Sequence, residues 1–213
     1  MSERSIVNRV YESILRNKEA GRHYWLRKAY KHKNLSTKEF QQIWSEWWRG
    51  IAPPRVEADL ILIFEDPIKL IDEALIGCVE VEYFSGKDIG KKNFYEGLQQ
   101  TLAFSVFGFD GLSLWHIFAK DVKDETIKNY SDAMEELVRG FKLSIFYLVT
   151  KILDDDELTL KCFKPCQLEK SIDYFIDSFQ SYWVMEGNRN PVLKDSKIKD
   201  RRKVIKTLLK IPV

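Results

Sequence analysis

The stretch Leu75–Phe84, with the sequence LIGCVEVEYF, decides the fold and places two acids within it. Alternate side chains of an extended strand share a face, so Glu80 and Glu82 point the same way while the valines beside them point into a core. Burying like charges is costly unless a partner neutralises them, and a hard divalent cation commonly neutralises a carboxylate cluster. This strand therefore predicts a metal site.

A second strand is predicted over 58–64, a run dense in Leu and Ile, with a loop or turn over 65–73. The two strands are expected to pair antiparallel. Asp59, near the start of the first strand, then lies at the same end of the hairpin as Glu80. Two structural alternatives stay open. The acids of 75–84 could be the solvated face of an edge strand, and Asp59 could cap a turn within an ion network with Glu57 and Arg55.

The remaining pattern indicates an α/β fold with a mixed sheet, because helical and strand periodicities alternate along the chain. Residues 1–186 are predicted to form one domain, and 187–213 a basic tail that is partly helical over 199–209. The stretch 21–33 is ambiguous and could begin a strand. Helices are predicted over 4–18, 36–48, 93–107, 124–152 and 167–185, and further strands over 112–118 and 158–163.

The net charge is +2, but positive and negative residues are unevenly distributed along the chain. Residues 1–50 hold 11 Lys/Arg against 5 Asp/Glu, residues 187–213 hold 9 against 2, and residues 51–186 hold 14 against 25. Basic ends around an acidic centre are typical of a protein that contacts phosphates at its periphery and concentrates carboxylates around metal. Solvated charged ends are the alternative. No signal pattern or long apolar run occurs, so we expect a soluble, cytoplasmic protein without a membrane partner.

The acids and the helix that follows them resemble the PD-(D/E)XK nuclease superfamily, whose restriction-endonuclease-like core is a helix, three strands, a helix and a strand. The resemblance covers about residues 4–120, with further helices expected after it. The run Phe94–Gln100 and the strand end Trp115–Phe118 also look like superfamily proteins of crenarchaea and of the spindle-shaped fuselloviruses of Sulfolobus.

The resemblance implies a role for each matching residue. Asp59 and Glu80 match the two acids that bind Mg2+ (or Mn2+), and Glu82 takes the place of the motif lysine. Glu12 matches the acid on the first helix of archaeal Holliday junction resolvases and would complete the metal site. Gln99 or Gln100 matches the glutamine of RecB-like members, and we assign Gln99 to catalysis with Asp59, Glu80 and Glu82.

Two departures accompany the resemblance: the motif proline is absent before Asp59, and Glu82 replaces lysine. Glu82 could hold a second ion or accept a proton, while Lys87, Lys91 or Lys92 could fold back to supply positive charge. The basic residues expected to contact DNA are Lys91, Lys92, Arg201, Arg202 and Lys203. His116, alternating with apolar residues in a strand, is expected to be a hydrogen-bonded core histidine.

The sequence therefore predicts a metal-dependent DNA nuclease that acts in viral replication, recombination or repair, in the host cytoplasm if the chain is viral. The first alternative is a nuclease-fold protein that binds DNA without cutting it. A regulator that uses residues 36–49 as a recognition helix is a further alternative. Cutting a duplex or junction needs two active sites, so a homodimer is expected, with the helix over 124–152 as a candidate interface.

Overall fold

A computed structural model describes residues 2–22, 25–47, 50–51, 56–65, 74–154 and 158–211. The predicted helix end at Trp48, Arg55 of the alternative ion network and nearly all of the predicted loop over 65–73 lie outside these residues. The helices are α1 (Glu3–Glu19), α2 (Lys38–Trp47), α3 (Leu98–Phe104), α4 (Asp124–Gly140), α5 (Ile172–Val184) and α6 (Ser196–Leu208), with 3-10 turns η1 (Ser105–Phe107), η2 (Glu186–Asn188) and η3 (Pro191–Lys194). The strands are β1 (Leu26–Asn34), β2 (Glu57–Phe64), β3 (Leu75–Phe84), β4 (Gly111–Phe118), β5 (Phe146–Asp154), β6 (Thr159–Lys164) and β7 (Leu168–Ser171).

The strands form one mixed sheet in the order β1-β2-β3-β4-β5-β6-β7, so strands that follow each other in the chain are also neighbours in space. β1, β2 and β3 are antiparallel, β3, β4 and β5 are parallel, and β6 and β7 return antiparallel. The predicted α/β class with a mixed sheet is confirmed. The antiparallel pairing of the two acid-bearing strands is confirmed as well.

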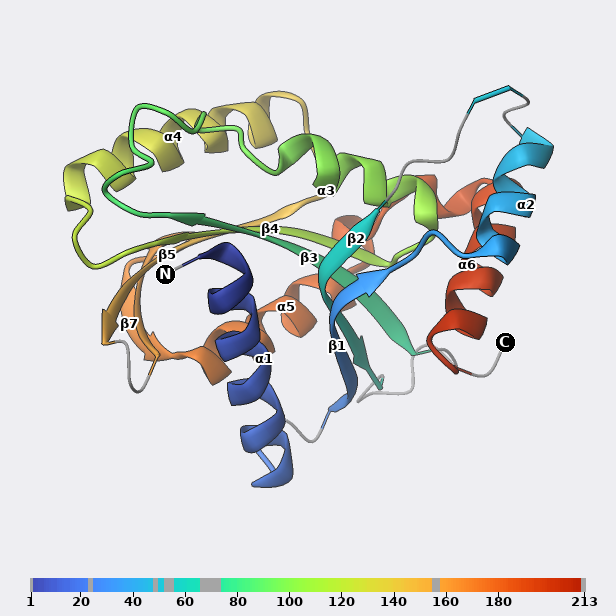
Figure 1. Ribbon diagram of the computed structural model, residues 1–213, viewed down its shortest axis with the longest axis horizontal. Coiled ribbons are helices and arrows are strands. Elements are labelled where there is room, and N and C mark those ends of the chain that lie inside the picture. The colour runs from blue at the N-terminus through green and yellow to red at the C-terminus, as the bar shows by residue number, and fades with distance from the viewer. Residues whose placement is uncertain are drawn as a thin grey trace.

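Helices cover both faces of the sheet (Figure 1). α1 and α5 lie on one side, α3 and α4 lie on the other, and α2 and α6 contact each other near β1 and β2. Every residue of β3 and β4 is buried, which agrees with parallel strands covered on both faces. None of the helices in the described part of the chain is both long enough and apolar enough to span a membrane.

Side-chain caps mark the starts of α1 and α2. Ser2 accepts a hydrogen bond from the Ser5 N–H and begins α1, whose buried face repeats at helical spacing. α2 begins at Lys38, two residues after its predicted start, where the Thr37 hydroxyl accepts a hydrogen bond from the Phe40 N–H. The ambiguous region after residue 21 forms strand β1 from Leu26 onward.

Three predicted helices are too long. The predicted helix over 124–152 ends at Gly140, and the rest of its span forms β5, because the aromatic and β-branched run Phe146–Thr150 fits beside β4 in the parallel sheet. The helix predicted over 93–107 begins only at Leu98, because Gly97 has a φ of +76° that a helix does not allow. The helix predicted from 167 is preceded by β7, which pairs with β6.

The segment after residue 186, expected to be a basic tail, packs onto the domain. Ile205 and Leu209 are fully buried, and Arg201 is buried with its guanidinium 4.9 Å from the Trp44 ring. Arg202 forms an ion pair of 2.8 Å with buried Asp110. These basic side chains therefore hold α6 against the loop before β4.

A pair of glycines gives the α5 side of the sheet its close packing. Gly77 of β3 lies opposite Gly111 of β4, and the buried Trp183 ring of α5 lies flat against both. A Cβ at Gly77 would lie 2.0 Å from the ring, and one at Gly111 2.2 Å from it. Only glycine at both positions allows the indole to lie directly against the backbone.

We predict that Gly111→Ala lowers the free energy of unfolding by about 1–3 kcal/mol, because the methyl group overlaps a rigid buried ring. The measurement is urea unfolding followed by circular dichroism. Gly140→Ala is the matched control, since a Cβ there meets nothing within 4 Å, and it is expected to be neutral or to stabilise by up to about 1 kcal/mol. Equal stability of the Gly111→Ala variant and the wild type would contradict this packing.

Candidate functional site

β2 and β3 separate at the residues that carry acids. The last paired residues on this side are Leu60 and Val79, and Asp59 is the next residue on β2. Asp59 Oδ2 accepts a hydrogen bond of 3.0 Å from the Val81 N–H. The carboxylate therefore bridges the two strands where they part and stands close enough to Glu80 to repel it.

Glu80 and Glu82 lie inside the protein. β3 is the third of seven strands, and these glutamates are only 4% and 9% exposed. The alternative of a solvated edge strand is therefore wrong. Burial, with added repulsion from Asp59 and Glu82, raises the pKa of Glu80 to about 10. Burial also raises the pKa of Asp59 to about 7, against the opposing effect of the Val81 hydrogen bond.

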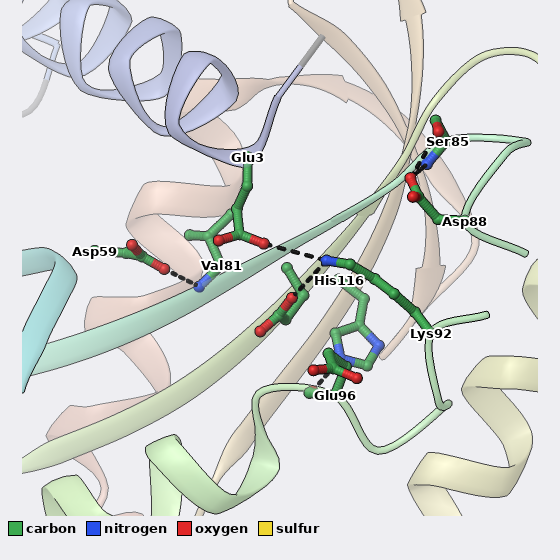
Figure 2. A network of polar contacts seen from close by, with 9 residues as sticks. Glu3, Asp59, Val81, Ser85, Asp88, Lys92, Glu96 and His116 are labelled. Carbon is green, nitrogen blue, oxygen red and sulfur yellow. Dashed lines mark hydrogen bonds and ion pairs between the residues drawn. The ribbon is translucent and has the colours of Figure 1, made fainter.

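Lys92 supplies positive charge to the site from the loop after β3 (Figure 2). Its Nζ lies 3.0 Å from Glu82 Oε2 and 3.3 Å from Glu3 Oε2. Burial disfavours the charged amine, but attraction to the two glutamates outweighs it and raises the pKa of Lys92. Burial and repulsion from Glu3 raise the pKa of Glu82 to about 8, with Lys92 opposing them. Of the three lysines expected to fold back towards the strand, Lys92 does so, while Lys87 and Lys91 are exposed.

The glutamine in contact with the acids is Gln100 rather than Gln99. Gln100 Nε2 donates to Glu80 Oε2 at 3.0 Å and to the Glu57 carbonyl at 3.1 Å. It thus joins α3 to both acid-bearing strands and fixes one oxygen of Glu80. Gln99 is exposed on the same helix.

The helix acid in the network is Glu3, not Glu12. Glu3 lies in the first turn of α1 and bonds Lys92. Glu12 is further along the same helix, by about 13 Å at 1.5 Å per residue, and its carboxylate is 4.0 Å from Lys31 Nζ. The sequence offered a signal for Glu3 only in its position at the helix start, where an acid also suits the helix dipole.

His32 of β1 adjoins the acids from the other side, and the sequence gave no reason to select it. Its Nδ1 lies 3.4 Å from Glu57 Oε1 and 3.8 Å from Asp59 Oδ1. Burial and the nearby charge of Arg4 lower the pKa of His32. The imidazole is therefore held mainly neutral beside two carboxylates.

Buried hydrogen bonds fix the loop that carries Lys92. His116 Nε2 lies 3.0 Å from the Glu96 carbonyl, which only accepts, so the proton is on Nε2 and Nδ1 accepts from the Tyr147 hydroxyl at 3.1 Å. The expectation of a hydrogen-bonded core histidine is confirmed, and burial lowers the pKa of His116 to about 4. On the far side of the loop, the Tyr130 hydroxyl donates to the Lys92 carbonyl at 3.3 Å.

The basic residues expected to contact DNA divide into two groups. Arg201 and Arg202 are committed to contacts within the fold, as described above, so their assignment to nucleic acid is corrected. Lys203 is exposed and pairs with Asp200 at 2.8 Å. Lys91 is exposed beside the site, and Lys92 points into it.

The donor set fits a hard divalent cation in its chemistry. Three carboxylates have raised pKa values because their charge is buried and repelled by neighbouring acids, and one dication would remove both penalties. Gly97 lies against the Glu82 side chain, and its lack of a Cβ leaves room for that side chain. A Cβ at this position would lie 2.8 Å from Glu82 Cγ. Within the described ranges, no three His, Cys, Asp or Glu side chains are already close enough together to hold a metal ion. Binding would therefore draw the repelling carboxylates together.

No family model, curated protein or solved structure matches this chain. The geometry of the acids, Lys92, Gln100 and His32 therefore carries the interpretation of the site.

We predict that Glu80→Gln raises the free energy of unfolding of the metal-free protein at pH 7 by about 1–3 kcal/mol, because the buried carboxyl must take up a proton on folding at this pH and the amide need not. A carboxyl whose pKa is raised on folding stabilises below its unfolded pKa of about 4.5 and loses that effect as pH rises. The gain should therefore grow from pH 5 to pH 9. Chemical unfolding across this range measures it.

The same variant should lose the stabilisation that millimolar Mg2+ or Mn2+ gives the wild type. Glu125→Gln, in the first turn of α4, is the control and should behave as the wild type does. An equal metal-induced increase in wild type and Glu80→Gln would contradict the assignment of Glu80 as a ligand.

Proposed function

We propose that the protein is a metal-dependent DNA nuclease that hydrolyses phosphodiester bonds in viral DNA replication, recombination or repair. The element order supports a restriction-endonuclease-like core: α1 precedes the antiparallel strands β1, β2 and β3, and α3 crosses to the parallel strand β4. On this proposal α2 is an insertion between the first two strands. The segments from α4 onward extend the sheet and cover its faces.

The observation that carries the proposal is the meeting of buried Glu80 and partly buried Asp59 where their strands part, with a lysine and a glutamine bonded to the same cluster. Asp59 and Glu80 come from neighbouring strands, Lys92 from the loop and Gln100 from α3. A purely structural ion network would balance its charges. Here Lys92 faces several acids whose pKa values are raised by burial and by repulsion from one another.

Asp59 and Glu80 would hold Mg2+ or Mn2+. When bound, the ion polarises the scissile phosphate and lowers the pKa of a water molecule. Gln100 donates to Glu80 Oε2, so Oε1 would be the oxygen left to bind the ion. Glu82 holds Lys92 Nζ at 3.0 Å, so the amine has a fixed direction from which to meet a phosphate oxygen. The second Glu82 oxygen is a proton acceptor for the attacking water.

The partner in this proposal is DNA, whose phosphates the exposed Lys91 and Lys203 would contact together with other basic side chains. A homodimer belongs to the proposal because two sites are needed to cut both strands of a duplex. Its candidate interface changes, since residues 124–152 form α4 and β5 rather than one helix. At the turn between these elements Phe141 is 73% exposed, which leaves an apolar side chain at the surface.

The test is cleavage of a panel of duplex, single-stranded, flap and four-way-junction DNA in Mg2+ or Mn2+. Asp59→Asn and Glu80→Gln are expected to lower the rate by at least about 100-fold, because each removes a ligand of the ion that polarises the phosphate. Glu12→Gln should cut as the wild type does, since Glu12 lies away from the network. Unchanged cleavage by both acid variants would refute the site.

Lys92 separates this proposal from its alternative, a nuclease-fold protein that binds DNA without cutting it. Lys92→Met is expected to lower cleavage by about 100-fold and to leave metal binding intact, because the amine acts on the phosphate rather than on the ion. Lys87→Met, an exposed lysine of the same loop, is the matched control. Salt-sensitive DNA binding by the wild type with no cleavage of any substrate in either metal would establish the binding protein instead.

A further inference from the structure

A pocket of about 380 Å3 lies beside Lys92, between the loop before α3 and the helix α4. The loop contributes Lys92, Asn93 and Phe94 to its lining, and α4 contributes Asn129 and Tyr130. The proposed function uses only the amine of Lys92 and gives this pocket no role. Its lining combines two aromatic rings with two side-chain amides, and proteins hold unpaired nucleobases with such groups.

Hydrogen bonds fix the loop wall of the pocket before any ligand binds. The Ser85 N–H and hydroxyl donate to Asp88 Oδ2 at 2.8 and 2.6 Å, and the Asp88 carbonyl accepts from the Lys92 N–H at 3.0 Å (Figure 2). The Tyr130 hydroxyl accepts from the Gly90 N–H at 3.1 Å and donates to the Lys92 carbonyl at 3.3 Å, which joins α4 to the loop. A ligand would therefore have few protein groups to order when it binds.

The two asparagines bring polar groups to the pocket from both of its walls. Asn93 and Asn129 are exposed, and within the described part of the chain neither side-chain amide has a hydrogen-bond partner. A side-chain amide offers two donors and one acceptor, which suit the polar edge of a base. Phe94 is partly buried against the core, so its ring is held in place as a stacking surface.

Lys92 links this pocket to the acids. Its side chain extends from the loop to the acidic cluster, where Nζ lies 3.0 Å from Glu82 Oε2 (Figure 2). The pocket, lined by the neighbours of Lys92 in the loop, lies within the length of one lysine side chain of that amine. A nucleotide has a matching arrangement, because its base and its phosphate are both attached to one sugar.

We propose that the pocket binds an unpaired nucleobase of the DNA strand whose phosphate lies at Lys92. The assignment rests on the proposed function, since it places a base relative to the phosphate of that site. A base within a duplex is stacked and paired, so it could enter the pocket only after extrusion, at a cost that an unpaired base avoids. The pocket therefore favours single-stranded, flap or junction DNA over an intact duplex.

The first test compares two single-stranded DNAs of equal length, one with thymine bases and one abasic, which carry the same phosphates. Fluorescence anisotropy in Ca2+ should show that the wild type binds the thymine strand at least about 5-fold more tightly, because stacking adds affinity that phosphates alone do not. Phe94→Leu and Asn129→Ser should each reduce this preference and leave the affinity for the abasic strand unchanged. Tyr174→Leu, at a half-exposed aromatic residue of α5 across the sheet, is the matched control and should retain the preference.

The second test is cleavage in Mg2+ or Mn2+. The wild type should cut a flap faster than an intact duplex, and Asn129→Ser, at an exposed position, should lower this ratio. Equal wild-type affinity for the thymine and abasic strands, or a preference unchanged in both pocket variants, would overturn the inference and leave intact a nuclease that depends on Asp59 and Glu80. A retained base preference without cleavage of any substrate would overturn the hydrolysis and support the pocket. Absence of any DNA binding by the wild type would overturn both.

Discussion

The burial of like charges in the middle of the sheet is the constraint on which the rest of the structure depends. β3 is covered on both faces, yet Glu80 and Glu82 point from it towards α3, with Asp59 bonded across the strand gap. Burial removes water from these carboxyl groups and their mutual repulsion adds to that cost, so the pKa values of Asp59, Glu80 and Glu82 are all raised. On the proposed function, a divalent cation would balance this cluster.

The surrounding elements hold the acids in place. On the opposite face of β3 and β4, the glycine pair lets Trp183 pack against the backbone. On the acidic face, the loop before α3 brings Lys92 to Glu82, and buried His116 and Tyr130 fix this loop through its carbonyl groups. The same loop ends at Gly97, whose missing side chain leaves room for Glu82.

The sequence predicted the acid-bearing strands well because their signals are local. The alternation in 75–84 and the apolar run in 58–64 fix the strands, and their acids meet as expected. Helix ends were less predictable. The apolar run after Gly140 is compatible with a helix or with a buried strand, and it forms a strand because it can pair with β4 in the sheet. The sequence did not single out Gln100 and Glu3 as the residues that contact the acids. Gln99 and Gln100 differ by one residue of helical rotation, and Glu3 reaches the site because it lies at the start of α1. His32 depends on a single backbone angle that no pattern indicates.

Dependence on packing between distant segments also explains why Arg201 and Arg202 were wrongly expected to contact DNA. Arg201 and Arg202 lie in a charge-rich segment, and such a pattern favours exposure to solvent. The helix nevertheless packs onto the domain through buried Ile205 and Leu209, so both arginines point inward. Charge counts along a chain predict where basic residues occur, not which of them face solvent. Lys92 shows the converse, because a lysine in a loop of ordinary composition reaches the centre of the site.

The central claim is that the buried acids of β2 and β3 hold a divalent cation. The most direct measurement is anomalous diffraction at the manganese edge from crystals equilibrated with millimolar Mn2+. The account predicts a peak within about 2.2 Å of carboxylate oxygens of both Asp59 and Glu80. Well-ordered crystals with no peak at these carboxylates, and with Glu80 still bonded by Gln100 and Asp59 by the Val81 N–H, would contradict it.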